Sequence, residues 1–151
     1  MSAEQPPPPW QIWFDGCAHP NPGRLGLGVV LIGPAGERLE SSTLGGSGCN
    51  NEAEMLALAR ALEMARTAGA RQLHIRGDSD FAVRHVRGEH ITRLPHLKTL
   101  IARVQDSLAA FEHARLEWIP RHRNPDADRL SRAALGLPHK PAPRPVARRR
   151  R

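Results

Sequence analysis

Four carboxylates in this sequence lie where elements of secondary structure are expected to begin or end. Asp15 follows the alternating run "WQIWF", and Asp78 follows the run "RQLHIRG". Glu54 and Asp128 lie near the starts of two segments with helical spacing. If these ends converge, the carboxylates repel one another unless hard cations such as Mg²⁺ lie between them. Two such ions, about 3.5–4 Å apart, can stabilise the attacking and leaving oxygens of phosphodiester hydrolysis.

Three of these carboxylates also have a structural explanation. Asp15 is of a type that begins turns, and Asp78 or Ser79 can cap a following helix. The spacing Asn51-x-x-Glu54 resembles a capping box. Glu54, however, begins a helical stripe of apolar residues, and a carboxylate on a buried face needs a partner such as a cation.

The segment "NPDAD" contains two acids at different positions in a predicted helix. Asp126 lies in the first turn, where its charge suits the helix dipole, so we assign it a structural role. Asp128 lies about one turn in, next to apolar residues, which is too deep for the same explanation.

The elements that must position these acids follow the order βββαβααβα. Alternating apolar residues and turn formers indicate an antiparallel meander, and strand–helix crossovers follow it, so we expect a five-stranded mixed α/β sheet flanked by helices. The first strand is expected to end at Asp15, before the breakers Gly16 and Pro20. The expected strands cover 10–15, 25–33, 37–46, 71–79 and 114–120, and the expected helices cover 50–70, 80–88, 94–111 and 124–135.

Length and composition indicate one folded unit with basic character at one end. We expect a Pro-rich disordered segment at 1–9, a catalytic domain at 10–137 and a disordered basic tail at 138–151. Six of the 22 basic residues lie between His139 and Arg151, which leaves 16 basic against 15 acidic residues elsewhere. The tail therefore carries six of the seven net positive charges, and this charge favours an anionic partner.

Apolar runs, the first residues and the two cysteines predict where the chain is located and whether its thiols are reduced. No run of apolar residues reaches the roughly 18 of a membrane span, and the first residues do not resemble a secretion signal. Cys17 and Cys49 are far apart in sequence and lack metal-binding spacing, so we expect reduced thiols, no zinc and a cytoplasmic location.

Four motifs together carry a resemblance to a known family. The stretches "FDGCAHPNPGRLGLGVVL", "NNEAEMLALARAL", "GDSDFAV" and "RNPDADRLSRAA" follow one another between about Trp10 and Leu135. They resemble type 1 ribonuclease H, whose patterns are D-G-x(3,4)-N-P-G, T-N-N-x-A-E, D-S and N-x-x-A-D-x-L-A. Cys49 stands where the pattern prefers Thr. The chain also lacks the inserted Trp-containing basic helix of some members, and so resembles the compact branch.

The resemblance implies a ribonuclease H-like fold and a metal-dependent reaction. Asp15, Glu54, Asp78 and Asp128 correspond to the acids that hold two Mg²⁺ ions, for which Mn²⁺ can substitute, and Asp15 corresponds to the bridging ligand. The family cleaves the RNA strand of RNA–DNA hybrids endonucleolytically and leaves 5′-phosphate and 3′-hydroxyl ends. We expect a monomer without an obligate protein partner.

Further residues are assigned to the substrate or to an auxiliary role by the same resemblance. Asn21, Asn50 and Asn51 match residues that contact the minor groove, where amides reach 2′-hydroxyls; turn and cap formation is their alternative role. His122 and Arg123, with their neighbour Arg121, are candidates for an auxiliary role normally filled by a His on a longer loop. The basic tail is expected to supply hybrid affinity, with a solvated disordered end as the alternative. Arg84, Arg87 and Arg93 are alternative phosphate contacts, for which a solvated helix face is an equal interpretation.

Two other functions stay open at the level of sequence. The first is a nucleic-acid-binding module that has kept the fold but lost catalysis; the presence of all four acids argues against it. The second is a related nuclease that prefers RNA duplexes, which stays open because a fold alone does not fix the substrate.

Overall fold

The computed structural model describes residues 7–139 and has the predicted order of elements. Residues 1–6 and 140–151, which make up most of the segments predicted to be disordered, lie outside the described residues. A short 3-10 helix at Arg121–Arg123, absent from the sequence prediction, precedes the last helix. The elements are β1 (Trp10–His19), β2 (Gly23–Ile32), β3 (Arg38–Gly48), α1 (Asn50–Thr67), β4 (Gln72–Gly77), α2 (Asp80–Val86), α3 (Pro95–Ala109), β5 (His113–Trp118) and α4 (Pro125–Ala134).

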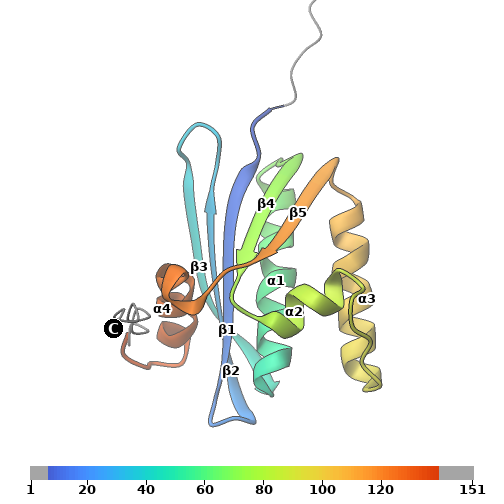
Figure 1. The fold of residues 1–151 in the computed structure, drawn as a ribbon. Coiled ribbons are helices and arrows are strands. Elements are labelled where there is room, and N and C mark those ends of the chain that lie inside the picture. Colours follow the sequence, from blue (N-terminus) through green and yellow to red (C-terminus); the bar gives the residue numbers. More distant parts are fainter. Residues whose placement is uncertain (1–6, 140–151) are drawn as a thin grey trace, which may run out of the picture.

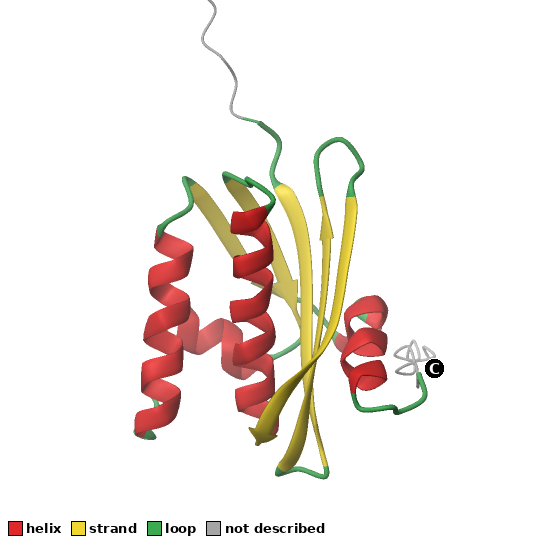
Figure 2. Ribbon diagram, turned by 180° about the vertical axis from the view of Figure 1, so that it is seen from behind, coloured by secondary structure: helices red, strands yellow, loops and turns green. Residues whose placement is uncertain are grey.

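The five strands form one mixed sheet with the order β3-β2-β1-β4-β5 (Figure 1). The meander β1–β2–β3 is antiparallel, and β4 and β5 are parallel to β1 and to each other. The long helices α1 and α3 lie on one side of the sheet, and α4 lies on the other (Figure 2). This arrangement confirms the five-stranded mixed sheet predicted from the sequence.

The hydrophobic core fills the space between the sheet and α1 and α3. Ile12 and Phe14 of β1, Leu58 of α1 and Ile75 of β4 are fully buried in it. On α1 the buried residues recur at helical spacing, because one stripe of the helix faces the sheet. The helix ends just before Gly69, whose φ of +77° suits a residue without a Cβ.

Three glycines in β1 and β2 let helices rest directly on the sheet. A Cβ on Gly16 would lie 2.2 Å from the carbonyl carbon of Ala53, at the start of α1. On the other face, a Cβ on Gly28 would lie 2.1 Å from the carbonyl oxygen of Ala127, and one on Gly26 would meet Ser131 of α4 at the same distance. These close contacts bring the first turns of α1 and α4 to the middle of β1.

Strand β1 is longer than predicted. It continues through Gly16 to His19, so the expectation that the strand ends at Asp15 is wrong. Pairing with β2 holds it extended: Asp15 pairs with Gly28, and the ladder runs on to His19 and Arg24. Pairing with the next strand overrides the local turn preference of Gly16, and the chain turns only at residues 20–22.

Candidate active site

The candidate site forms where β4 separates from β1. The parallel ladder stops at the pair Phe14 and Gly77, whereas β2 stays paired with β1 beyond this point. The backbone groups of β1 on the β4 side then need other partners, because buried N–H and C=O groups are rarely left unpaired.

Three side chains from two other parts of the chain, the start of α1 and the residue before α4, provide these partners. The Nδ2 of Asn124 donates to the carbonyl oxygen of Phe14 at 3.0 Å. Gly16 N donates to Oε2 of Glu54 at 3.1 Å, and Ala18 N donates to Oδ1 of Asn50 at 2.8 Å. Polar side chains thus satisfy the backbone groups along the free edge of β1, and these hydrogen bonds hold the side chains beside Asp15.

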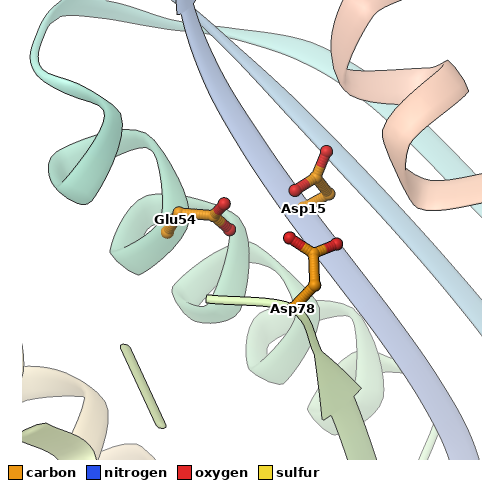
Figure 3. Close-up of side chains that lie close together, drawn as sticks. All are labelled: Asp15, Glu54 and Asp78. Atoms are coloured by element: carbon orange, nitrogen blue, oxygen red, sulfur yellow. The ribbon is translucent and has the colours of Figure 1, made fainter. Parts of the chain in front are cut away.

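Three of the four predicted acids meet at this edge. One carboxylate oxygen from each of Asp15, Glu54 and Asp78 lies within 4.8 Å of the other two. Figure 3 shows the three carboxylates directed toward a common space from β1, from α1 and from the end of β4. A donor set made only of carboxylate oxygens fits a hard cation such as Mg²⁺.

Glu54 does not form the capping box that its spacing suggested. The N-cap residue of α1 is Cys49, which makes no side-chain cap hydrogen bond, and Asn51 lies inside the helix. The carboxylate of Glu54 instead accepts from the backbone of Gly16. The second of the two interpretations of Glu54, as a residue of the site, therefore agrees with its position.

Asp78 follows β4 directly and is held by an asparagine. The Nδ2 of Asn124 donates to Oδ2 of Asp78 at 2.9 Å. The following helix is capped by Ser79, whose hydroxyl accepts from Ala82 N at 3.0 Å, so the carboxylate of Asp78 has no capping function.

Asp128 lies on α4 and stands slightly apart from the other three. It is 7% exposed and is not part of the group whose oxygens lie within 4.8 Å of one another. Its Oδ1 is 3.9 Å from a guanidinium nitrogen of Arg121. Asp126, in the same helical turn, is exposed and pairs with Arg38, in agreement with a structural role.

The proximity of the acids changes their pKa values. Burial, followed by the charges of Asp78 and Asp128, raises the pKa of Asp15 well above its usual range. Burial, followed by the charges of Asp15 and Asp78, does the same to the pKa of Glu54. Burial also raises the pKa of Asp78, against the lowering effect of its hydrogen bond with Asn124. The mutual repulsion and the burial of these carboxylates disfavour full ionisation, and a cation would offset the repulsion.

The three predicted minor-groove asparagines gather at the start of α1. Oδ1 of Asn21 accepts from the backbone N of Asn50, and Oδ1 of Asn50 accepts from Ala18 N. The Oδ1 atoms of both residues thus connect β1, the turn after it and the start of α1, and the NH₂ group of each is the part that can face a ligand. Asn51 is exposed in the first turn of α1.

The remaining candidates lie on exposed or half-exposed segments. His122 is half-buried, and Arg121 and Arg123 are exposed in the 3-10 helix before α4. Arg84 pairs with Asp80, and Arg87 lies 3.4 Å from Glu89. Their positions add no support for a phosphate contact beyond their exposure. The basic residues of the tail, Lys140 to Arg151, lie outside the described residues.

Two residues next to the acids were missed by the sequence analysis. Asn124 was expected only to begin the last helix, but its side chain makes no cap hydrogen bond and instead joins Phe14 to Asp78. Its Oδ1 is buried without a hydrogen-bond partner among the described residues. Ser131 donates to Oδ2 of Asp15 at 3.0 Å. Both belong to the matched motif "RNPDADRLSRAA", which was the signal that could have found them.

Comparison with known proteins identifies the family. The model of the family described as "Reverse transcriptase-like" matches residues 13–134. The chain belongs to this family. Among solved structures, the ribonuclease H1 of the archaeon Halobacterium salinarum superposes with a TM-score of 0.81 and 32% identity, over 85% of this chain and 98% of the other. The fold is therefore that of type 1 ribonuclease H.

A second solved relative holds a nucleic acid. The structure of LC11-RNase H1 in complex with an RNA/DNA hybrid superposes on this ribonuclease H-like chain with a TM-score of 0.77 and 34% identity, over 84% of this chain and 96% of the other.

Curated relatives are longer than this chain. Ribonuclease HI of Halobacterium salinarum is 35% identical over 124 residues, which cover 82% of this chain and 62% of the relative. The bifunctional protein Rv2228c of Mycobacterium tuberculosis is 32% identical over 126 residues, which cover 82% of this chain and 35% of the relative. Within residues 7–139, no helix has both the length and the apolar character needed to cross a membrane.

Proposed function

We propose that this chain is an endonuclease that hydrolyses the RNA strand of RNA–DNA hybrids with two divalent metal ions and leaves 5′-phosphate and 3′-hydroxyl ends. One observation carries the proposal: oxygens of Asp15, Glu54 and Asp78 lie within 4.8 Å of one another at the edge of β1. The likeness to a ribonuclease H1 that was solved with a hybrid supports the choice of substrate.

In this proposal the three clustered acids and Asp128 hold Mg²⁺, for which Mn²⁺ can substitute. When bound, such ions activate a water for attack and stabilise the leaving oxygen. The chain contributes the placement of the ligands: Asn124 orients Asp78, and Gly16 N orients Glu54. Oxygen-only ligands match the preference of Mg²⁺.

The substrate is assigned to the surface around the start of α1. In this proposal the NH₂ groups of Asn21 and Asn50, together with Asn51, contact sugar hydroxyls and base edges, which suits recognition of shape rather than sequence; the Oδ1 atoms of Asn21 and Asn50 already have backbone partners. His122 and Arg123 act as auxiliary residues at most. Residues 10–137 form the catalytic domain, which acts as a monomer, and the lone cysteines support a cytoplasmic location.

One experiment tests the reaction and the substrate together. One labelled RNA strand is incubated with the protein as a hybrid and as an RNA duplex, and a labelled DNA duplex is included, each with Mg²⁺ or with a chelator. Cleavage of the hybrid only, and only with metal, is the expected result. Preferential cleavage of the RNA duplex would favour the related nuclease, and binding without cleavage would favour a silent binding module.

A further inference from the structure

A buried hydroxyl outside the four acids contacts the most buried of them. Ser131 of α4 is fully buried, and its Oγ donates to Oδ2 of Asp15 at 3.0 Å. The motif pattern N-x-x-A-D-x-L-A has alanine at the position that Ser131 occupies. The hydroxyl is therefore a feature of this chain that the four-acid motif does not require.

The hydroxyl of Ser131 has a second acceptor within hydrogen-bond distance. Its Oγ also lies 2.9 Å from the carbonyl oxygen of Asp128, three residues earlier in α4. A serine hydroxyl has a single proton to donate, so it cannot serve both acceptors fully. A charge-assisted bond to an ionised carboxylate is the stronger of the two, so the proton turns to Asp15 when this residue is ionised.

The backbone that carries Ser131 is held in place by the sheet. Gly28 is paired with Asp15, and a Cβ on Gly28 would lie 2.6 Å from Ser131 N. A Cβ on Gly26 would lie 2.1 Å from the carbonyl oxygen of Ser131. Because α4 rests directly on these two glycines, the hydroxyl is fixed relative to Asp15 before any ligand binds.

We propose that Ser131 is a positioning residue, whose hydroxyl holds the carboxylate of Asp15 in the orientation that receives the cation. The inference rests on the proposed metal-binding function. Ser131 fixes Oδ2 of Asp15, just as Gly16 N and Asn124 fix oxygens of Glu54 and Asp78. Each of the three clustered carboxylates is then oriented by one donor. Hydrogen-bond partners of metal ligands typically change metal affinity about 10- to 100-fold when they are removed.

The test is Ser131→Ala in the full chain, with Mg²⁺ alone as the ligand and the rise in melting temperature as the readout. Alanine is the residue of the family pattern, so the variant is expected to fold. We expect the Mg²⁺ concentration for half-maximal stabilisation to rise about tenfold or more. The same shift is expected in the Mg²⁺ dependence of hybrid cleavage, whereas kcat at saturating Mg²⁺ and KM for the hybrid stay near their original values.

Two further variants separate positioning from packing. Ser42 donates to the carbonyl oxygen of Leu130 on α4 at 2.6 Å and is bonded to none of the four acids, so Ser42→Ala removes a hydroxyl bonded to the same helix. It should leave the Mg²⁺ midpoint unchanged. Ser131→Cys keeps a similar shape with a weaker donor and should give an intermediate midpoint.

The outcomes distinguish this proposal from the proposed function. If the midpoints of Ser131→Ala and Ser42→Ala both equal that of the original protein, Ser131 only packs α4, and the proposal is overturned. A tighter midpoint in Ser131→Ala also overturns it. If the original protein itself shows neither Mg²⁺-dependent stabilisation nor cleavage, the proposed function fails, and the role of Ser131 fails with it.

Discussion

The two sides of β1 differ in what they contribute to the protein. Toward α1 and α3, Ile12 and Phe14 are buried among apolar side chains, and their burial stabilises the fold. At the free edge beyond β4, Asp15 is buried among other carboxylates, and both burial and repulsion raise its pKa. Adjacent residues of one strand thus have opposite effects on stability. The apolar residues that face α1 and α3 stabilise the fold, whereas the buried carboxylate of Asp15 destabilises it.

The largest effect on stability is expected from the apolar side. Leu62 of α1 is 2% exposed and lies two helical turns beyond Glu54. Leu62→Ala should lower the free energy of unfolding by about 2–5 kcal/mol, the range for a large buried side chain that leaves a cavity. Chemical denaturation measures this change. If the folded variant also lost cleavage at saturating Mg²⁺, stability and catalysis would not depend on separate sides of β1, and the comparison would be contradicted.

A moderate effect on activity is expected from the exposed 3-10 helix. His122→Ala should reduce kcat by about tenfold to a hundredfold, near the lower part of the range for general acid–base catalysis, because the proposed ions perform the main activation. The melting temperature should stay the same, since His122 is only half-buried. Loss of cleavage down to the level of an Asp15 variant would contradict the auxiliary role.

A smaller effect is expected from pH in the absence of metal. The pKa values of Asp15, Glu54 and Asp78 are raised in the folded state, so the folded protein holds protons that the unfolded chain releases. The free energy of unfolding should therefore fall as pH rises from the usual carboxyl range through the raised pKa values. Melting curves at several pH values measure this slope.

A pair of variants identifies the source of the slope. Asp15→Asn should make it shallower, because one member of the cluster no longer ionises. Asp126→Asn is the matched control, since Asp126 is an exposed acid on α4 outside the cluster. Equal slopes in both variants would contradict the assignment to the buried acids.

The sequence predicted most of the fold because its local patterns agree with the tertiary structure. Apolar alternation and helical spacing identified all five strands and four helices in the correct order. The end of the first strand was predicted wrongly, because Gly16 indicates a turn locally, whereas pairing with β2 keeps β1 extended to His19 and the turn comes at residues 20–22. The turn preference of a single glycine does not report that Gly16 pairs with Leu27 of the neighbouring strand.

The site was predicted through its acids but not through the residues that orient them. Asp15, Glu54 and Asp78 were chosen because their chemistry and motif positions agree. The roles of Asn124 and Ser131 depend on contacts 110 and 116 positions away along the chain, with Phe14 and Asp15. An asparagine before a helix and a serine within one have common local explanations, so their types alone do not single them out.

The most direct test of the account is Asp15→Asn, measured for hybrid cleavage, hybrid binding and melting with and without Mg²⁺. Asparagine keeps the shape of the side chain and removes one negative ligand. The account predicts that cleavage is abolished and hybrid binding is retained. Without metal the variant should melt at the same temperature as the original protein or higher, because one buried charge and its repulsion are gone. It should lose most of the Mg²⁺-induced rise in melting temperature. An Asp15→Asn protein that still cleaves the hybrid would contradict the metal site.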